Sequence, residues 1–347
     1  MKSKVETLRS EGNSLAILGE AEEAVLGRLA AAFDPLATDI VFVSGSRMEG
    51  LGNSTSDFDL YVVQSEKYTG DPFVTVVLDA QYAVYEIFSL AHATRVATTL
   101  NAIDRNDYRQ IASLSLFELE FYYRVLIGRA LTSHHSFEQL RDSFRRSTID
   151  ECVATWCGLR SVVLLGEARQ KLALCREAGA YVAAQQAAAA ALDSFLAAHG
   201  QSYPGFKWRF EKLLRIVPKT SPDFKRAWDI KSLGRRDVSQ YLDAVAEFCR
   251  DMGMQAFESW SLNDVMCRQA KTAQAIVVNG QCFIVENKTT LFELDEASSK
   301  LWQWIATPTR RGDLLDRAEQ EQVMTALEVD EVLFDLAMHG LLRQGSV

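Results

Sequence analysis

The sequence IVFVSGSRMEGLGNSTSDFDLYVV, residues 40–63, decides the fold of the N-terminal part of the chain. Its first apolar run ends at Gly45-Ser46, and after a gap of ten residues a second run opens with Asp57-Phe58-Asp59. Successive side chains of a strand point to opposite faces, so Asp57 and Asp59 share one face while Phe58 enters the core. The pattern predicts strands at 40–43 and 57–63, a short helix near 47–50, and two carboxylates side by side.

The two halves of this motif suggest complementary chemistry. Two neighbouring carboxylates repel each other unless a cation lies between them, and divalent metals prefer such hard oxygen ligands. A glycine lets the backbone approach a phosphate closely, and the free N–H groups at a following helix start bind the anion. The competing interpretation is a polar loop between two strands, in which the aspartates only cap or turn the chain.

The motif resembles the signature of the DNA polymerase β-like nucleotidyltransferase superfamily, in its antibiotic-modifying and minimal bacterial types. The resemblance implies that Asp57 and Asp59 are catalytic and bind two Mg²⁺ or Mn²⁺ ions. It also implies that Gly45 and Ser46 hold the leaving phosphates of a nucleoside triphosphate, for which ATP is expected from cellular abundance. Arg47 either neutralises these phosphates or points into solvent.

The resemblance further implies a third carboxylate, on a neighbouring strand, that completes the metal site or takes the proton of the acceptor. Two residues compete for this role. Glu86 lies in the apolar run AVYEIFSL within a predicted strand at 81–90, just before a helix that starts near Ala91. Asp79 lies in LDAQ, where a turn explains it equally well. Glu86 is the preferred catalytic and metal-binding candidate.

Length and composition narrow the class of protein. A chain of 347 residues suggests two or three domains, and a net charge of −9 argues against coating nucleic acid or an anionic membrane. The six cysteines show no metal-type or disulfide-type spacing. The N-terminus lacks a hydrophobic signal core, and no apolar run reaches the length of a membrane span. We therefore expect a cytoplasmic protein.

Hydrophobic periodicity predicts an α+β fold in three parts. Residues 1–92 would form a small mixed-sheet nucleotidyltransferase core that starts with a helix at 3–33. Residues 93–265 would form a helical bundle for the acceptor and nucleotide, with an alanine-rich helix at 178–198 that stops at Gly200. Residues 272–347 predict three strands and three helices, the order of a winged helix-turn-helix.

Basic residues concentrate in the helical part. Between residues 207 and 236 there are ten basic and three acidic residues. They predict either a phosphate-attracting wall opposite the metal site or a solvated helix face. Lys207 and Arg209 are the best candidates for nucleotide binding. Arg124 stands where related transferases often place an arginine, although a surface ion pair is preferred for it.

Two C-terminal segments, LFELDEASSKLWQWI (residues 291–305) and DEVLFDLAMHGLLRQG (residues 330–345), resemble the PqqD-like family. This resemblance implies recognition of the leader of a ribosomally made peptide, which would add as a strand along Thr290–Leu294 beside the last helix, at 329–342. Residues 271–347 carry seven basic and twelve acidic side chains, so DNA binding is not expected. The alternative is a domain that only stabilises a dimer or caps the bundle.

The leading hypothesis is a metal-dependent nucleotidyltransferase that transfers a nucleoside monophosphate to a ribosomally made peptide. One alternative is transfer to a small hydroxylated molecule of the aminoglycoside type or to a protein. A second is a catalytically silent scaffold that presents a peptide. Fold alone does not decide among them.

Overall fold

The computed structural model describes residues 20–32, 35–53, 56–65, 73–78, 81–232, 237–257, 262–270, 273–278, 280–286, 290–338 and 341–344. Helices and a mixed sheet combine in it, so the predicted α+β class is confirmed. The chain forms two compact units: residues 1–104, 116–154 and 196–219 make the first, and residues 105–115, 155–195 and 220–347 the second. None of the described helices has both the length and the apolar character needed to cross a membrane.

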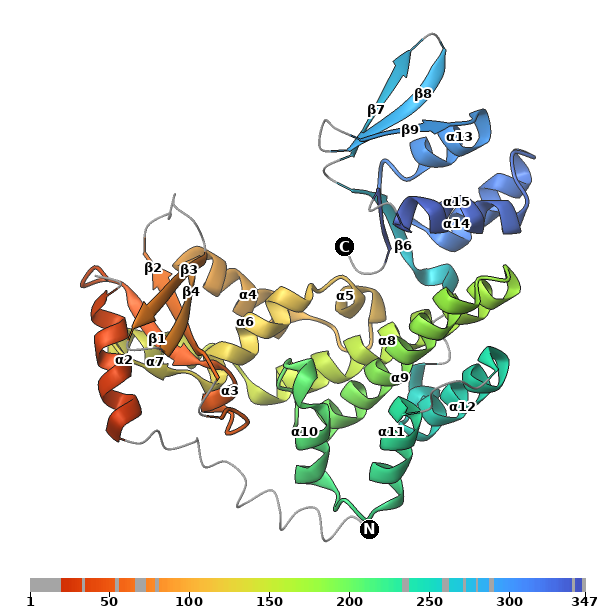
Figure 1. The fold of residues 1–347 in the computed structure, drawn as a ribbon. Coiled ribbons are helices and arrows are strands. Elements are labelled where there is room, and N and C mark those ends of the chain that lie inside the picture. Colours follow the sequence, from red (N-terminus) through yellow and green to blue (C-terminus); the bar gives the residue numbers. More distant parts are fainter. Residues whose placement is uncertain are drawn as a thin grey trace. The chain divides into compact units, whose positions relative to one another are not determined.

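A five-stranded sheet lies at the centre of the first unit (Figure 1). Side by side, its strands are β3 (Phe73–Leu78), β4 (Gln81–Ser89), β2 (Phe58–Gln64), β1 (Ile40–Ser44) and β5 (Arg129–Ala130). β2 and β4 are parallel and the other neighbours antiparallel, which makes the sheet mixed. The strands predicted at 40–43, 57–63 and 81–90 are confirmed as β1, β2 and β4, whereas the two-residue strand β5 was not predicted.

Helices pack on both faces of this sheet. Those of the first unit are α2 (Glu20–Ala32), α3 (Gly45–Met48), α4 (Leu90–Ala102), α6 (Leu116–Ile127), α7 (His134–Arg141), the 3₁₀ turn η1 (Phe206–Trp208) and α10 (Arg209–Ile216). On one face, the hydroxyl of Tyr85 donates to the carbonyl of Leu29 in α2. On the other, Phe88 of β4 packs against Phe121 of α6, with ring centroids 4.4 Å apart. Of the helix predicted at 3–33, residues 3–19 lie outside the described residues.

Two long helices contribute residues to both units. They are α8 (Arg146–Ala173) and α9 (Glu177–Ala198). The prediction that the alanine-rich helix stops at Gly200 is confirmed, because α9 ends at Ala198 and Gly200 has a φ of +77°. Residues 93–265 are therefore shared between the units, and the three-part division stays a prediction.

The second unit adds helices and two small sheets. Its helical elements are α5 (Tyr108–Ala112), α11 (Pro222–Ser232), α12 (Val238–Asp251), η2 (Met254–Phe257), η3 (Leu262–Asp264), α13 (Glu296–Trp304), α14 (Arg311–Gln320) and α15 (Ala326–Met338). One sheet has the order β10 (Thr309–Arg310), β6 (Met266–Gln269) and β11 (Leu342–Gln344). The other has the order β7 (Ala273–Val278), β8 (Gln281–Glu286) and β9 (Thr290–Leu294).

The C-terminal elements follow the predicted order, but the last helix ends earlier than predicted. Asp295 caps α13 by accepting a hydrogen bond of 2.7 Å from the Ser298 N–H. The last helix, however, ends at Met338 rather than at Leu342, which pairs with Gln269 in the sheet of β6. Two adjacent leucines after α15 fit a helix or a short strand equally well, so periodicity misplaced this boundary. The winged helix-turn-helix assignment stays a prediction.

A buried ion pair holds the C-terminal core together. The Arg311 guanidinium donates to both carboxylate oxygens of Asp330, with 2.7 Å from Nε to Oδ1, and its Nη1 donates to Asn263. Removing one partner leaves the other as an uncompensated buried charge. We expect Asp330→Asn to lower the free energy of unfolding by about 3 kcal/mol. Urea unfolding followed by tryptophan fluorescence measures this change, because Trp302 lies in the same core.

The matched control is Glu331→Gln, an exposed carboxylate on the same helix. It should change the free energy of unfolding by no more than about 0.5 kcal/mol. Equal effects of the two substitutions would show that the Arg311–Asp330 pair does not stabilise this core.

Candidate active site

The two halves of the motif meet because β1 and β2 are neighbours. Ser44 lies opposite Asp59 in the antiparallel ladder, so the turn after β1 reaches the Asp59 carboxylate. Gly45 has a φ of +88°, and a Cβ there would lie 1.7 Å from Asp59 Oδ2. The backbone N–H of Ser46 hydrogen-bonds the same carboxylate. Glycine is required at position 45 because the Asp59 carboxylate occupies the space that a side chain would fill.

The expected alternation along β2 is confirmed. Phe58 and Leu60 are fully buried, whereas Asp57 and Asp59 are half-buried on the other face. Burial raises the pKa of Asp59 above its ordinary value, and the negative charge of Asp57 raises it further. The two carboxylates therefore destabilise each other in their ionised forms, which is the condition that a divalent cation relieves.

Arg124 of α6 contacts this pair through Asp59. Its Nη1 lies 3.3 Å from Asp59 Oδ2 and 3.0 Å from the Tyr203 hydroxyl, and its guanidinium lies 5.0 Å from the centre of the Tyr203 ring. Burial lowers the pKa of Arg124, but Tyr61, Asp59 and Tyr203 raise it overall, so the guanidinium stays charged. The ion pair preferred for Arg124 is present, but its partner is Asp59 of the candidate site and only 13% of the Arg124 side chain is exposed, so it is not a surface pair.

Two further carboxylates surround Arg124. Glu86 accepts a hydrogen bond of 3.3 Å from the Tyr61 hydroxyl, and burial raises its pKa. Burial also raises the pKa of Glu120, which was not predicted as a site residue although it lies one helical turn before Arg124. Asp59, Glu86 and Glu120 interact with Arg124, and Asp57 interacts with Asp59, so these carboxylates outnumber Arg124 and Lys207, the cations whose charges act on Asp59.

The acidic side chains do not all converge on one point. Among the described residues, no group of three or more His, Cys, Asp or Glu side chains is placed to hold a metal ion. Glu86 pairs with Tyr61, two positions beyond Asp59 along β2, which corresponds to about 7 Å. Asp57 and Asp59 thus fit a hard divalent cation as a pair, and Glu86 lies farther along the same face. Asp79, the other candidate, lies outside the described residues.

The predicted phosphate-binding residues have different surroundings. Arg47 is buried rather than in solvent: its Nε donates 2.9 Å to the Ser56 carbonyl, and its guanidinium lies 4.3 Å from the centre of the Phe58 ring. Lys207 is exposed, and its charge lowers the pKa of Asp59. Arg209 stacks over Phe206 at 4.9 Å. Lys207 is therefore the basic residue of this segment that acts on the carboxylates.

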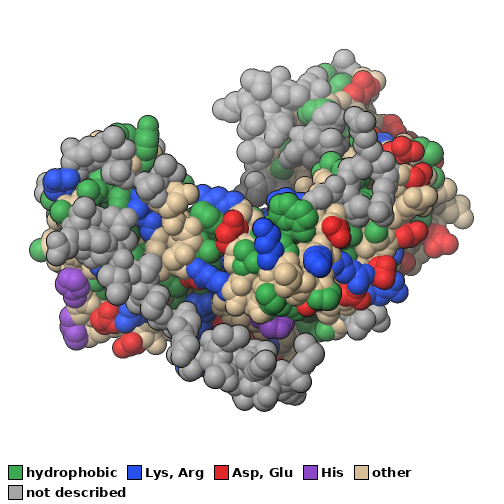
Figure 2. All heavy atoms as spheres, turned by 60° about the horizontal axis from the view of Figure 1, so that its bottom comes forward, with side chains coloured by type: hydrophobic (Ala, Val, Ile, Leu, Met, Phe, Trp, Pro, Cys, Tyr) green, Lys and Arg blue, Asp and Glu red, His purple; other side chains and the backbone are tan. Residues whose placement is uncertain are grey.

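The basic segment does not form one outward wall. Lys212 is buried and donates 2.7 Å to the Tyr203 carbonyl, which corrects the expectation that all these basic side chains face out. Arg215 binds the Glu49 carboxylate at 2.9 Å and its carbonyl at 2.7 Å. On the coloured surface in Figure 2, basic side chains lie among acidic ones. Arg235 and Arg236 lie outside the described residues.

Glu49, Tyr123 and Tyr203 fix the loop after α3 and were not predicted. The Tyr123 hydroxyl donates 2.9 Å to Glu49 Oε2, and the rings of Tyr123 and Tyr203 are 5.8 Å apart. These residues come from three distant segments, so spacing in the sequence carries no signal for them. Their effect is to hold the turn that begins with Gly45 against α6 and α10.

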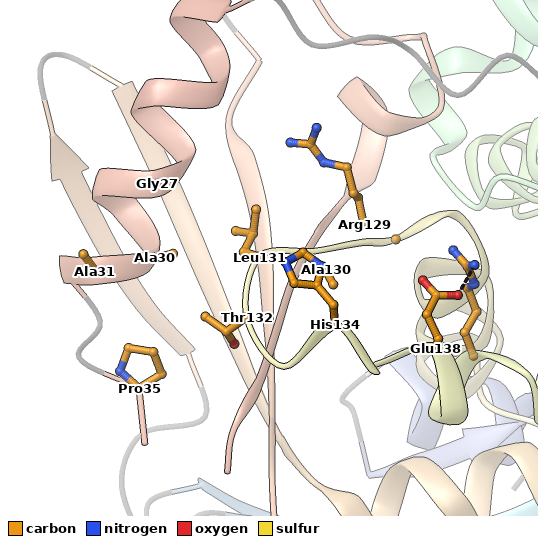
Figure 3. A pocket seen from close by; sticks show the side chains of 12 residues that line it. Gly27, Ala30, Ala31, Pro35, Arg129, Ala130, Leu131, Thr132, His134 and Glu138 are labelled. Atoms are coloured by element: carbon orange, nitrogen blue, oxygen red, sulfur yellow. Dashed lines mark hydrogen bonds and ion pairs between the residues drawn. The ribbon is translucent and has the colours of Figure 1, made fainter. Parts of the chain in front are cut away.

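A cavity of about 640 Å³ lies elsewhere in the first unit, at the edge of the sheet formed by β5 (Figure 3). It is lined by α2, β5 and α7, and by charged groups that include Arg129 and the ion pair of Glu138 with Arg141. None of the predicted site residues lines it. The cavity is therefore separate from the carboxylates of β2.

Comparison with known proteins finds a weak structural similarity and no match in sequence. No protein-family model matches the chain, and no curated protein matches it. Among solved structures, the chain is similar to a nucleotidyltransferase-like protein from Exiguobacterium sibiricum 255-15, with a TM-score of 0.38 and 14% sequence identity. The match covers 67% of this chain and 73% of that one. At this low similarity the function has to be argued from the residues of the site.

Arg124 should control how stability depends on pH. Asp59, Glu86 and Glu120 have raised pKa values, so the stability linked to them is present at low pH and is lost as pH rises through those values. Replacing Arg124 by Gln removes the charge that opposes this shift. We expect Arg124→Gln to lose about 2–4 kcal/mol at pH 8 and distinctly less at pH 5.

Thermal unfolding between pH 5 and pH 8 measures the difference. The control is Arg141→Gln, which breaks the more exposed ion pair with Glu138 in the same unit and should cost at most about 1 kcal/mol, as exposed pairs do. If Arg124→Gln lowered the stability by the same amount at pH 5 and at pH 8, this would contradict the role of Arg124 as the counter-charge of the carboxylates.

Proposed function

We propose that the protein is a metal-dependent nucleotidyltransferase that transfers a nucleoside monophosphate, AMP from ATP by our expectation, to a peptide. The observation that carries the proposal is the contact of the Gly45-Ser46 turn with the Asp59 carboxylate, beside Asp57, in a site with excess negative charge. A half-buried pair of like charges costs stability, and cation binding is a function that accounts for it.

Asp57 and Asp59 would hold the metal ions in this proposal. Two divalent ions, when bound, stabilise the charge that develops on the attacking and leaving oxygens of an in-line displacement. The Gly45-Ser46 backbone would bind the leaving pyrophosphate, and Lys207, whose charge already acts on Asp59, would attract the triphosphate. Arg124 would orient the Asp59 carboxylate through its ion pair.

Glu86 is the proposed general base. The acceptor oxygen forms a bond to the α-phosphorus, the bond between that phosphorus and the bridging oxygen of pyrophosphate breaks, and the acceptor proton moves to Glu86. A carboxylate whose pKa is raised toward neutral pH is a better base than one with the ordinary value. Its position on the face of Asp59 supports this assignment.

The peptide acceptor rests on the C-terminal strands. β9 lies at one end of its three-stranded sheet, and among the described residues only β8 pairs with it. A leader could therefore add along Thr290–Leu294. Of the apolar residues expected to line the adjoining groove, Leu333, Leu336 and Leu341 are buried in the core. The side chains of Phe334 and Ala337 lie outside the described residues.

Transfer of label tests the proposal. The full chain is incubated with each α-labelled nucleoside triphosphate, Mg²⁺ or Mn²⁺, and precursor peptides with and without their leader. We expect label on the leader-containing peptide, and we expect Asp57→Asn and Asp59→Asn each to lower the rate by at least about 100-fold, because they remove metal ligands. Asp142→Asn, an exposed aspartate of the same unit, is the control. Wild-type rates in both site variants would refute the proposal.

The dependence of rate on pH tests Glu86. As a base it must be ionised, so the rate should rise with pH through the raised pKa of Glu86. We expect Glu86→Gln to lower the rate by about 100-fold and to abolish this rise. Tyr61→Phe is the matched variant: its lost hydrogen bond normally lowers the pKa of Glu86, so the rise should move to higher pH. A rise that persists in Glu86→Gln would assign the base elsewhere.

A further inference from the structure

The hairpin of β3 and β4 exposes large apolar side chains at the edge of the sheet. Phe73 is 53% exposed, Val77 58% and Tyr82 60%. Folded proteins expose single apolar residues commonly, but a cluster of them on one sheet face marks a binding surface more often. We call these three residues the apolar strip, and all of them belong to the first unit.

The strand register places the apolar strip on the face of the carboxylates. Val77 lies opposite Tyr82, and Phe73 lies opposite Glu86, in the antiparallel ladder of β3 and β4. Residues opposite each other in a ladder share a face, as do residues two apart along a strand. Glu86 in turn shares its face with Tyr61, to which it is hydrogen-bonded. Phe73 therefore lies beside the proposed general base, and Val77 and Tyr82 lie about 13 Å farther along the hairpin, one position before the pairing of Ala83 with Phe58.

The in-line geometry of the proposed reaction also favours an acceptor over β4 and β3, where the apolar strip lies. The Gly45-Ser46 turn follows β1, on one side of β2, whereas β4 and β3 lie on the other side. In a phosphoryl-type transfer the attacking and leaving oxygens are roughly in line, on opposite sides of the phosphorus. With pyrophosphate at Gly45-Ser46, the acceptor must approach from above β4 and β3. This step rests on the proposed function.

We infer that the apolar strip is the acceptor subsite and that it binds an aromatic or aliphatic side chain of the peptide, next to the group that receives the nucleotide. The strip itself carries no charge, so a polycationic acceptor of the aminoglycoside type would gain nothing from it and would lose hydration. An apolar side chain is attracted by the surface that it buries, and an aromatic one also by stacking on Tyr82.

The test compares two synthetic acceptors, acetyl-Gly-Ser-Phe-Gly-amide and acetyl-Gly-Ser-Lys-Gly-amide. The proteins are the wild-type full chain, the double variant Val77→Thr/Tyr82→Thr, and Val277→Thr as control. Threonine keeps a high strand propensity, so exposed sites should tolerate it. Val277 is a matched valine, 71% exposed, on a strand of another sheet. Thermal unfolding verifies that the variants fold.

Two readouts separate the inference from the proposed function. The first is binding of dye-labelled peptides, by fluorescence anisotropy, with Mg²⁺ and a non-hydrolysable ATP analogue present. The second is kcat and KM for transfer of label from ATP. We expect the wild type and Val277→Thr to bind the phenylalanine peptide about tenfold more tightly than the lysine peptide. The double variant should lose this preference, through KM rather than kcat.

Each outcome decides one question. A preference for phenylalanine that disappears in the double variant alone supports the subsite, even if no label is transferred, in which case the proposed function fails and the subsite stands. A preference that the double variant retains, equal binding of both peptides, or stronger binding of the lysine peptide by the wild type overturns the inference, whether or not transfer occurs.

Discussion

The first unit depends on one electrostatic contact, that between the Asp59 carboxylate and the Arg124 guanidinium beside Gly45. Moving a carboxylate out of water costs free energy, and here Asp57 adds to that cost. Arg124 offsets it, and its own carbonyl accepts a hydrogen bond of 2.8 Å from Ser44. The contact thus joins the end of β1, the start of β2 and the middle of α6. The same residues determine how this unit folds and what its site can bind.

The central strands were predictable because they follow one another in the sequence. β1 and β2 are consecutive antiparallel neighbours, so apolar alternation alone brings Gly45 to Asp59. Arg124 and Tyr203 could not be assigned in this way. They are 65 residues from Asp59 and 79 residues from Arg124, respectively, along the chain. Their place depends on how α6 packs and on the course of the loop after α9, and neither leaves a local pattern.

Two other features could not be predicted from the sequence: the orientation of the basic side chains and the very short strands of the second unit. A segment with seven more basic than acidic residues suggests one positive surface. The number of basic residues, however, does not show where each side chain points, and the buried Lys212 side chain donates a hydrogen bond to a backbone carbonyl. The sheet of β10, β6 and β11 is built from strands of two, four and three residues. Such strands are shorter than a recognisable alternation, so only tertiary pairing defines them.

The chain passes between its two units at 104–105, 115–116, 154–155, 195–196 and 219–220. No single cut in the sequence therefore separates the first unit, which contains Asp57 and Asp59, cleanly from the second. Two of the passages fall inside α8 and α9, so a fragment ending there would interrupt a helix. Gene fusions and domain exchanges would have to keep residues 1–219 intact, and a loss of helix order around residues 155–195 would reach the first unit through α8 and α9.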